Sequence, residues 1–319
     1  IFIIYYFFIF KFFKSIKIKP IFIFCIFSPL FLIFPVAELE ALGRKDILIL
    51  LFFLIYCYFY TILNFINLSL LLVFLYSILL LTHEVSIFYL PFFYFVSFLK
   101  IRNIKVSSFI AYFFISIFFL VIIYYLSNSA HTDEEVKLMC SKLKTILNEK
   151  CGLGAYMLNR TLSDNMAELG IKFKDASRGL LIIFTGYFAL IISIINSNFK
   201  NKKINFIFKK INFQVSFLFI FLLTTIPFFI AVDWGRWFNL SYSMSVLLYF
   251  FCYKNELISF KDSKLILYFN RKIYDNKKIF LIFLFLLCFS WNPKAVYHED
   301  IGSIPIYRKL LSITNSYLN

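Results

Sequence analysis

The chain has 319 residues, of which 61% are hydrophobic and only 16% are charged, with a mean hydropathy of +0.83 and a formal net charge of +16. Soluble domains are about half apolar and about one quarter charged, so this composition excludes an ordinary soluble protein. We expect one integral membrane domain over residues 1–319, built as an all-α bundle of transmembrane helices. The opening IFIIYYFFIF has no initiating Met, and we interpret it as the remainder of a clipped first span.

Apolar runs predict about nine further spans, since about 20 apolar residues cross a bilayer. The turn LNFINLS (63–69) divides two of them, because one helix over 47–82 would be 36 residues long. The predicted spans are 20–36, 47–63, 65–82, 84–99, 108–126, 179–197, 213–231, 238–253 and 279–292. We therefore expect a polytopic bundle of about 9–10 spans.

Basic residues gather in four of the segments between these spans. These segments hold 19 of the 33 Lys and Arg residues but only three of the 17 Asp and Glu residues; they are 11–19, 100–107, 198–212 and 254–278. An even number of predicted spans separates each from the next, so all four lie on one side, which the positive-inside rule identifies as the cytoplasm. This bias explains the basic loops without a nucleic-acid partner. We predict a multi-pass protein of the plasma (inner) membrane, with membrane lipid around it.

The stretch LLLTHEVSIFYLPFF places His83 and Glu84 at the outer end of a span, and residues 47–99 contain no other His, Asp, Glu, Lys or Arg. Ionisable groups beside hydrocarbon are costly unless they are paired or used, so His83 and Glu84 form a candidate acid/base pair. The alternative is helix capping, with Thr82 as N-cap and Glu84 in the first turn. The residue four positions after His83 is Ile87, so the H-E-x-x-H zinc motif is absent and we predict no metal site.

The segment 127–178 is the one large outer loop and contains short helices in our prediction. Thr132, the acids that follow it and apolar residues at helical spacing predict a capped amphipathic helix at the surface, acting as a lid or re-entrant element; the apolar residues are Val136, Met139, Leu143 and Leu147. Cys140 and Cys151 are candidates for a disulfide in an oxidising compartment. Arg160 is a candidate for binding an anionic group, and the alternative is a solvated loop cation.

The stretch PFFIAVDWGRWFNLSY (227–242) combines an acid, an arginine and two tryptophans at an outer helix end. Asp233 and Arg236 at i and i+3 can pair, and tryptophans are common where helices leave the hydrocarbon, so an interfacial anchor is one interpretation. The other is a site for a phosphorylated sugar. Arg236 would bind phosphate, Trp234 and Trp237 would stack on sugar rings, and Asp233 would accept a hydroxyl proton.

These motifs and the many-spanned layout with one large outer loop resemble the O-antigen polymerase and EpsG-like group, bacterial membrane proteins of surface-polysaccharide clusters. The resemblance implies joining of glycan units carried on polyprenyl pyrophosphate, held by outer-face arginines. Carried onto this chain, it assigns the pyrophosphate to Arg236, with Arg160 second, whereas the group's large loops often hold more arginines. We combine it with the residue analysis: His83, Glu84, Asp233 and Arg236 are the catalytic candidates, without a cofactor.

Two alternatives stay open at this point. Multispan glycosyltransferases that use polyprenyl-phosphate sugars place paired acids in the first outer loop, and AELEALGRKD (37–46) offers Glu38 and Glu40 in a loop shorter than that family has. A transporter or flippase of cell-envelope precursors is the other alternative. The predicted span centres contain no Asp, Glu, Lys or Arg, which disfavours an ion-coupled transporter. The sequence does not determine the oligomeric state.

Overall fold

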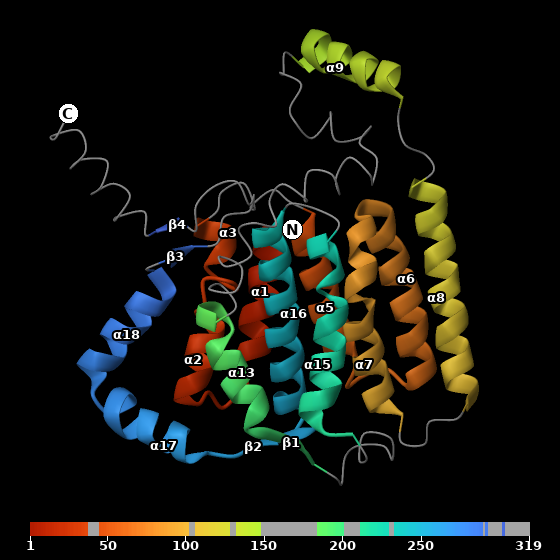
Figure 1. The fold of residues 1–319 in the computed structure, drawn as a ribbon. Coiled ribbons are helices and arrows are strands. Elements are labelled where there is room, and N and C mark those ends of the chain that lie inside the picture. Colours follow the sequence, from red (N-terminus) through yellow and green to blue (C-terminus); the bar gives the residue numbers. More distant parts are fainter. Residues whose placement is uncertain are drawn as a thin grey trace, which may run out of the picture.

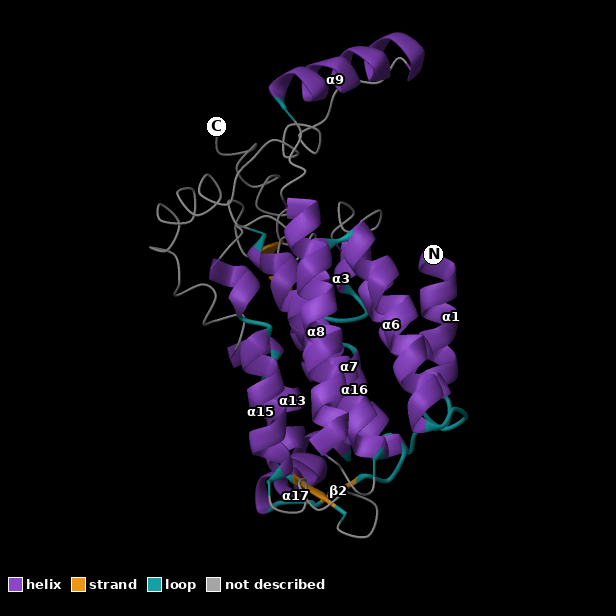
Figure 2. Cartoon of the chain, turned by 90° about the vertical axis from the view of Figure 1, so that its right-hand side faces the viewer, coloured by secondary structure: helices purple, strands orange, loops and turns teal. Residues whose placement is uncertain are grey.

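The computed structural model is mostly helical (79%), which confirms the all-α part of the predicted fold class. It describes residues 1–37, 45–101, 106–127, 132–147, 184–200, 211–229, 233–289, 291–292 and 302–303. Figure 1 shows most of the helices running side by side, and the view turned by 90° shows the same near-parallel arrangement (Figure 2). The loop 127–178 is described only at Ser127 and over 132–147.

The helix α16 (Trp234–Lys254) forms the centre of the bundle and is buried along nearly its whole length. It packs against α5 (Asp46–Phe59) and α7 (Leu90–Lys100). Its small residues Ser241, Ser243 and Ser245 are at most 1% exposed, and small side chains let neighbouring helices approach closely. Outside α5 and α7 lie α6 (Phe65–Thr82) and α8 (Val106–Ser127), which pack on each other.

The other flank of the bundle consists of shorter helices. They are α1 (Phe2–Phe13), α2 (Pro20–Ile26), α3 (Phe34–Ala37), α13 (Phe188–Ile195), α15 (Phe213–Leu223) and α18 (Lys277–Phe289). The helix α1 packs on α5, whereas α13 packs on α2 and α15. The helix α9 (Asp133–Leu147) lies beyond one end of the bundle (Figure 1).

The predicted single helix over 20–36 is wrong, because the chain leaves the helical conformation between α2 and α3. The side chain of Ser28 accepts a hydrogen bond from the Leu30 amide at 3.3 Å, which competes with helix geometry as short hydroxyl side chains do. Carbonyls in this part of the chain bond to α16 instead: Asn239 Nδ2 donates to Leu30 O at 2.8 Å, and Tyr242 Oη donates to Cys25 O at 3.0 Å.

Two short antiparallel ladders lie at opposite ends of the bundle (Figure 1). At one end β1 (Ser197–Phe199) pairs with β2 (Ile258–Phe260), and the helix α17 (Lys264–Phe269) and a π-helical turn (Asn270–Tyr274) follow. At this end Lys19 and Asp262 form an ion pair at 2.9 Å. At the other end β3 (Trp291–Asn292) pairs with β4 (Gly302–Ser303).

Within the described ranges, two helical segments are long and apolar enough to cross a membrane: Phe65–Thr82 and Ser107–Tyr125. The second is only 11% buried, and its exposed side chains include Phe113, Phe114 and Tyr125 at 63%, 62% and 77%. Soluble proteins rarely expose contiguous apolar surface of this kind. Four further apolar helices are shorter, namely Phe2–Phe13, Asp46–Phe59, Val85–Lys100 and Phe213–Phe229, so the number of spans stays a prediction.

Candidate functional site

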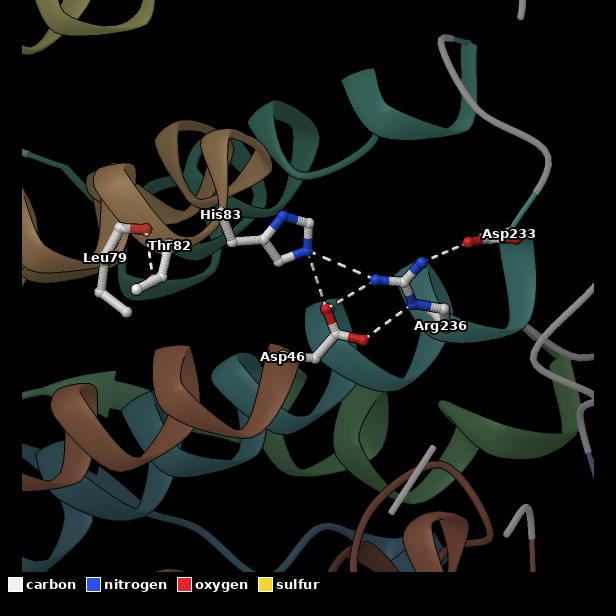
Figure 3. A network of polar contacts seen from close by, with 6 residues as sticks. All are labelled: Asp46, Leu79, Thr82, His83, Asp233 and Arg236. Carbon is white, nitrogen blue, oxygen red and sulfur yellow. Dashed lines mark hydrogen bonds and ion pairs between the residues drawn. The ribbon is translucent and has the colours of Figure 1, made fainter. Parts of the chain in front are cut away.

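Four polar residues from three distant parts of the chain converge at one end of the bundle (Figure 3). Asp46 is the first residue of α5, and His83 separates α6 from the 3₁₀-helix η1 (Glu84–Tyr89). Asp233 is the N-cap of α16 and Arg236 lies in its first turn. We call Asp46, His83, Asp233 and Arg236 the polar cluster.

Arg236 is held between two carboxylates. Its Nε donates to Asp46 Oδ2 at 2.8 Å and its Nη2 donates to Asp46 Oδ1 at 2.9 Å, which is a bidentate pair. Its Nη1 donates to Asp233 Oδ2, so the predicted i, i+3 pair is present. A guanidinium paired along two edges has little freedom to turn, so Arg236 is fixed in position.

His83 lies beside both members of the bidentate pair (Figure 3). Its Nε2 is 3.0 Å from Asp46 Oδ1 and 3.4 Å from Arg236 Nη2. With a proton on Nε2 the ring donates to Asp46, and without one the same atom accepts from Arg236. The shorter distance favours donation to Asp46. His83 is thereby oriented by a carboxylate, as histidines that transfer protons commonly are.

The cluster is largely removed from solvent, because the side chains of Asp46, His83 and Arg236 are 11–14% exposed. Burial alone would raise the pKa of Asp46, but the hydrogen bond with His83 and the charge of Arg236 outweigh it and hold the pKa well below its usual value. Burial disfavours the charge of Arg236, yet the neighbouring Asp46 and Asp233 raise the pKa of Arg236 above its usual value. Asp46 and Arg236 are therefore both ionised at neutral pH, and their opposite charges compensate each other.

Asp233 differs from the other members in its exposure. Its side chain is 24% exposed, and Arg236 Nη1 is its hydrogen-bond donor within the cluster. Both Asp46 and Asp233 stand at helix N-termini, where a negative charge is favourable, whereas Arg236 in the first turn of α16 is not. The two carboxylates therefore compensate the unfavourable placement of Arg236.

Asp46 is the functional candidate that sequence reasoning missed. It was visible as an acid directly before the apolar run ILILLFF, the usual sign of a helix N-terminus. Its contact with Arg236 joins residues 190 positions apart, so no local pattern reveals it. One signal could have indicated it: the predicted topology places Arg236 on the outer side, where an arginine beside hydrocarbon needs a carboxylate partner, and it places Asp46 in the first outer loop.

The alternative interpretation at His83, in which Thr82 caps the next helix, is not supported by the hydrogen bond that the Thr82 side chain makes. Thr82 Oγ1 donates to Leu79 O at 2.9 Å, and η1 has His83 as its N-cap with no side-chain cap hydrogen bond. A hydroxyl that donates backward along its own helix does not cap the next one. Glu84 begins η1, and its side chain lies outside the described part of the structure.

Both tryptophans of DWGRW pack against protein. Trp237 is 1% exposed, and Arg236 Cζ lies 5.0 Å from the centre of its ring. Trp234 is 8% exposed and its Nε1 donates to Phe228 O at 3.1 Å. Trp237 thus supports the guanidinium by a cation–π contact, whereas Trp234 joins the start of α16 to the 3₁₀-helix η4 (Ile226–Phe229).

The predicted helix in the outer loop is confirmed as α9. Thr132 N donates to Glu135 Oε2 at 2.9 Å and Glu135 N donates to Thr132 Oγ1 at 3.3 Å, which is a capping box. Cys140 is disulfide-bonded, while Cys25, Cys57, Cys252 and Cys288 are free. Cys151 and Arg160, like Glu38 and Glu40, lie outside the described residues.

Comparison with protein-family models, with curated proteins and with solved structures found no match to this chain. Among the residues that the structure describes, no group of three or more His, Cys, Asp and Glu side chains could hold a metal ion. The polar cluster therefore has to be interpreted from its own geometry. It offers a fixed guanidinium, a histidine oriented by a carboxylate and one more exposed carboxylate, which together can bind an anionic group and move a proton.

Proposed function

We propose that the protein is a polytopic protein of the plasma (inner) membrane with the polar cluster at its extracytoplasmic face. The apolar side chains exposed on α6, α8 and α15 support this, as do the helices that run side by side with the two candidate spans. The end of the bundle opposite the cluster carries β1, β2 and the basic residues near them, the arrangement expected for a cytoplasmic face.

Within that membrane protein, the polar cluster is the site of a glycan polymerase or glycosyltransferase acting on polyprenyl-(pyro)phosphate-linked sugars. The observation that carries this proposal is the fixed Arg236, whose Nη1 edge faces the more exposed Asp233 while its other edge is held by Asp46. A phosphate group can take the place of Asp233 on Nη1 without loss of the Asp46 pair. Arg236 would then stabilise the charge that the leaving phosphate gains as the sugar is transferred.

Asp233 released from Arg236 becomes the acceptor of a proton. In the proposed step the acceptor hydroxyl oxygen forms a bond to the anomeric carbon, the bond between that carbon and the phosphate oxygen breaks, and the hydroxyl proton passes to the Asp233 carboxylate. Asp46 and His83 act as positioning residues that hold Arg236 in place. Trp237 is buried and contacts the guanidinium of Arg236, so its ring is not accessible for stacking on a sugar.

A groove between α7 and α15 supports a lipid-linked substrate. It has a volume of about 540 Å³ and an almost entirely apolar lining that includes Pro91, Tyr94, Phe98, Phe219 and Leu223. The chain continues from α7 back through η1 to His83, and from α15 through η4 toward Asp233; the two 3₁₀-helices contact each other. A prenyl chain in this groove would place its phosphate near the cluster.

A transporter of the same lipid-linked precursor is the second candidate function. The observation that favours it is the neutralisation of Arg236 by buried Asp46, since ionisable groups buried in membrane proteins commonly line transport pathways. The two candidates differ in where substrate accumulates when the site fails. A failed transferase leaves lipid-linked units in the outer leaflet, whereas a failed transporter leaves them in the inner leaflet.

The test uses Arg236→Lys and Asp233→Asn in the native host, with Arg271→Lys at the opposite end of the bundle as the matched control. Lysine keeps the charge but loses the planar fork, so we expect shorter or less polymer and lipid-linked units in the outer leaflet. The control should resemble the wild type. Unchanged polymer in both variants at normal protein levels would contradict the proposal, and units retained in the inner leaflet would favour the transporter.

A further inference from the structure

A second pocket lies at the end of the bundle opposite the polar cluster, between the C-terminal ends of α1, α5 and α16. Its volume is about 190 Å³. The floor is apolar and includes Phe12, Leu54 and Phe251, whereas Lys11 and Lys254 contribute ammonium groups at the rim. This pocket is distinct from the polar cluster, because α5 and α16 begin at the cluster and end here.

In the described part of the chain, the two lysines at this rim lack a carboxylate partner. Lys11 Nζ lies 4.7 Å from the centre of the Tyr58 ring, and Lys254 Nζ lies 5.1 Å from that of Phe12. Neither forms an ion pair within the described ranges of the chain, in contrast to Lys19, which pairs with Asp262. Burial lowers the pKa of Lys254; Cys57 opposes this shift, and the nearby charge of Lys11 adds to it. Two neighbouring ammonium groups that have no acidic partner in the described ranges favour the arrival of an anion.

A helix-capping role accounts for only part of this arrangement. Lys254 Nζ donates to Phe12 O at 3.1 Å, which satisfies a carbonyl at the end of α1. An ammonium has three N–H donors, so Lys254 keeps two, and Lys11 makes only a ring contact among the described residues. The donors that remain point to a ligand with several acceptor oxygens.

The surroundings of the pocket favour a lipid over a free ion. Large apolar side chains are exposed beside it on α1 and after α5; they include Phe7 at 62% and Ile62 at 60%. Thr61 and Asn255 add a hydroxyl and an amide at the rim. An apolar floor with a rim of lysines and neutral polar groups matches a phosphodiester with an acyl chain attached.

We propose that this pocket binds the phosphate of an anionic membrane lipid between Lys11 and Lys254, with an acyl chain along the exposed apolar side chains of α1 and of the turn after α5. Basic pockets between membrane helices on the cytoplasmic side recognise anionic headgroups in this way. The bound lipid ties α1 to α5 and α16 through its headgroup. The site lies away from the polar cluster, so it does not depend on which reaction occurs there.

The experiment measures retention of phosphatidylglycerol against phosphatidylcholine by the purified full-length chain, using native mass spectrometry. The pocket variants are Lys11→Gln alone and Lys11→Gln with Lys254→Gln. The matched control removes the same charge from the same end of the molecule through Lys264→Gln with Lys272→Gln. We expect affinity for phosphatidylglycerol to fall about five-fold in the single variant and about thirty-fold in the double variant, with the control within about two-fold.

Three results would overturn the proposal. Equal losses in the pocket variants and the control would show diffuse attraction to the surface rather than a site. Retention of phosphatidylglycerol by the double variant would exclude the two lysines as its ligands. Inorganic phosphate that displaces the lipid and stabilises the wild-type chain equally well would assign the pocket to a free anion. Lys11→Gln removes no hydrogen bond within the described residues, so its result holds even where the double variant fails to fold.

Discussion

Asp46 organises the polar cluster although burial alone disfavours its charge. It accepts both hydrogen bonds of the bidentate pair with Arg236 and lies 3.0 Å from His83 Nε2. Only 11% of its side chain is exposed, so a lost partner cannot be replaced fully by water. The Asp233 carboxylate accepts one hydrogen bond from the guanidinium of Arg236 and is more exposed. The two carboxylates that pair with Arg236 therefore have different roles. Asp46 holds the guanidinium in place, whereas Asp233 can give up its contact to a phosphate.

The substitution Asp46→Asn should destabilise the protein far more than Asp233→Asn. Breaking a buried ion pair costs about 3 kcal/mol or more, because the remaining guanidinium stays buried, whereas a partly exposed pair contributes about 1 kcal/mol or less. The free energy of unfolding can be measured by titration with SDS in mixed micelles. Equal losses in the two variants would show that Asp46 and Asp233 hold Arg236 to the same degree.

The contribution of Asp46 to stability should disappear in acid. Its pKa in the folded protein lies below the ordinary value of 3.8, so as the pH falls through about 4 the unfolded chain takes up the proton first and unfolding becomes easier. The stability difference between wild type and Asp46→Asn is then complete above about pH 5 and shrinks toward pH 3. A difference that stays constant over this range would contradict the depressed pKa.

The break between α2 and α3 shows how one element depends on another. Its carbonyls are not satisfied within a continuous helix, and the side chains of α16 supply donors at Leu30 O and Cys25 O. Irregular backbone inside a membrane bundle persists only where protein groups provide such partners. Polar side chains of α16, which lower the hydropathy of this helix, therefore provide hydrogen-bond donors to the backbone of neighbouring segments.

Replacing Asn239 by Leu should loosen the contact between α16 and the break. The Leu30 carbonyl would keep only Ser243 Oγ, at 3.4 Å, and an unsatisfied buried carbonyl costs about 1–2 kcal/mol. Asn196→Leu is the matched control, because Asn196 Nδ2 donates to Ile192 O one turn earlier in its own helix. SDS titration should show a clear loss for the first variant and a smaller one for the control; the reverse order would exclude the proposed role of Asn239.

At the scale of the whole molecule, the polar cluster and the pocket with the two lysines lie at opposite ends of the helix bundle. The polar cluster lies at the start of α5 and α16, and the pocket with Lys11 and Lys254 lies near their ends. Between these two ends, α6, α8 and α15 expose large apolar side chains. In our proposals this arrangement orients the molecule across the membrane, with an anion-binding site at each face.

The proposed orientation predicts which face a label reaches. A membrane-impermeant maleimide applied to intact cells should modify Lys137→Cys in α9 but not Lys264→Cys in α17, and both should react after the cells are opened. The free cysteines Cys25, Cys57, Cys252 and Cys288 are buried and should contribute little background. Labelling of Lys264→Cys in intact cells would reverse the orientation or reduce the number of spans.

The sequence by itself determined the all-α class, the boundaries of α6 at Phe65 and Thr82, and the capping box of α9, because each follows from local periodicity and local hydrogen bonds. It also predicted the pairing of Asp233 with Arg236, which needs only the geometry of one helical turn. Only the tertiary structure decided that the predicted helix over 20–36 is interrupted between α2 and α3, and that Asp46 holds Arg236. Both depend on hydrogen bonds between groups about 200 positions apart in the sequence, which come together only when the helices pack.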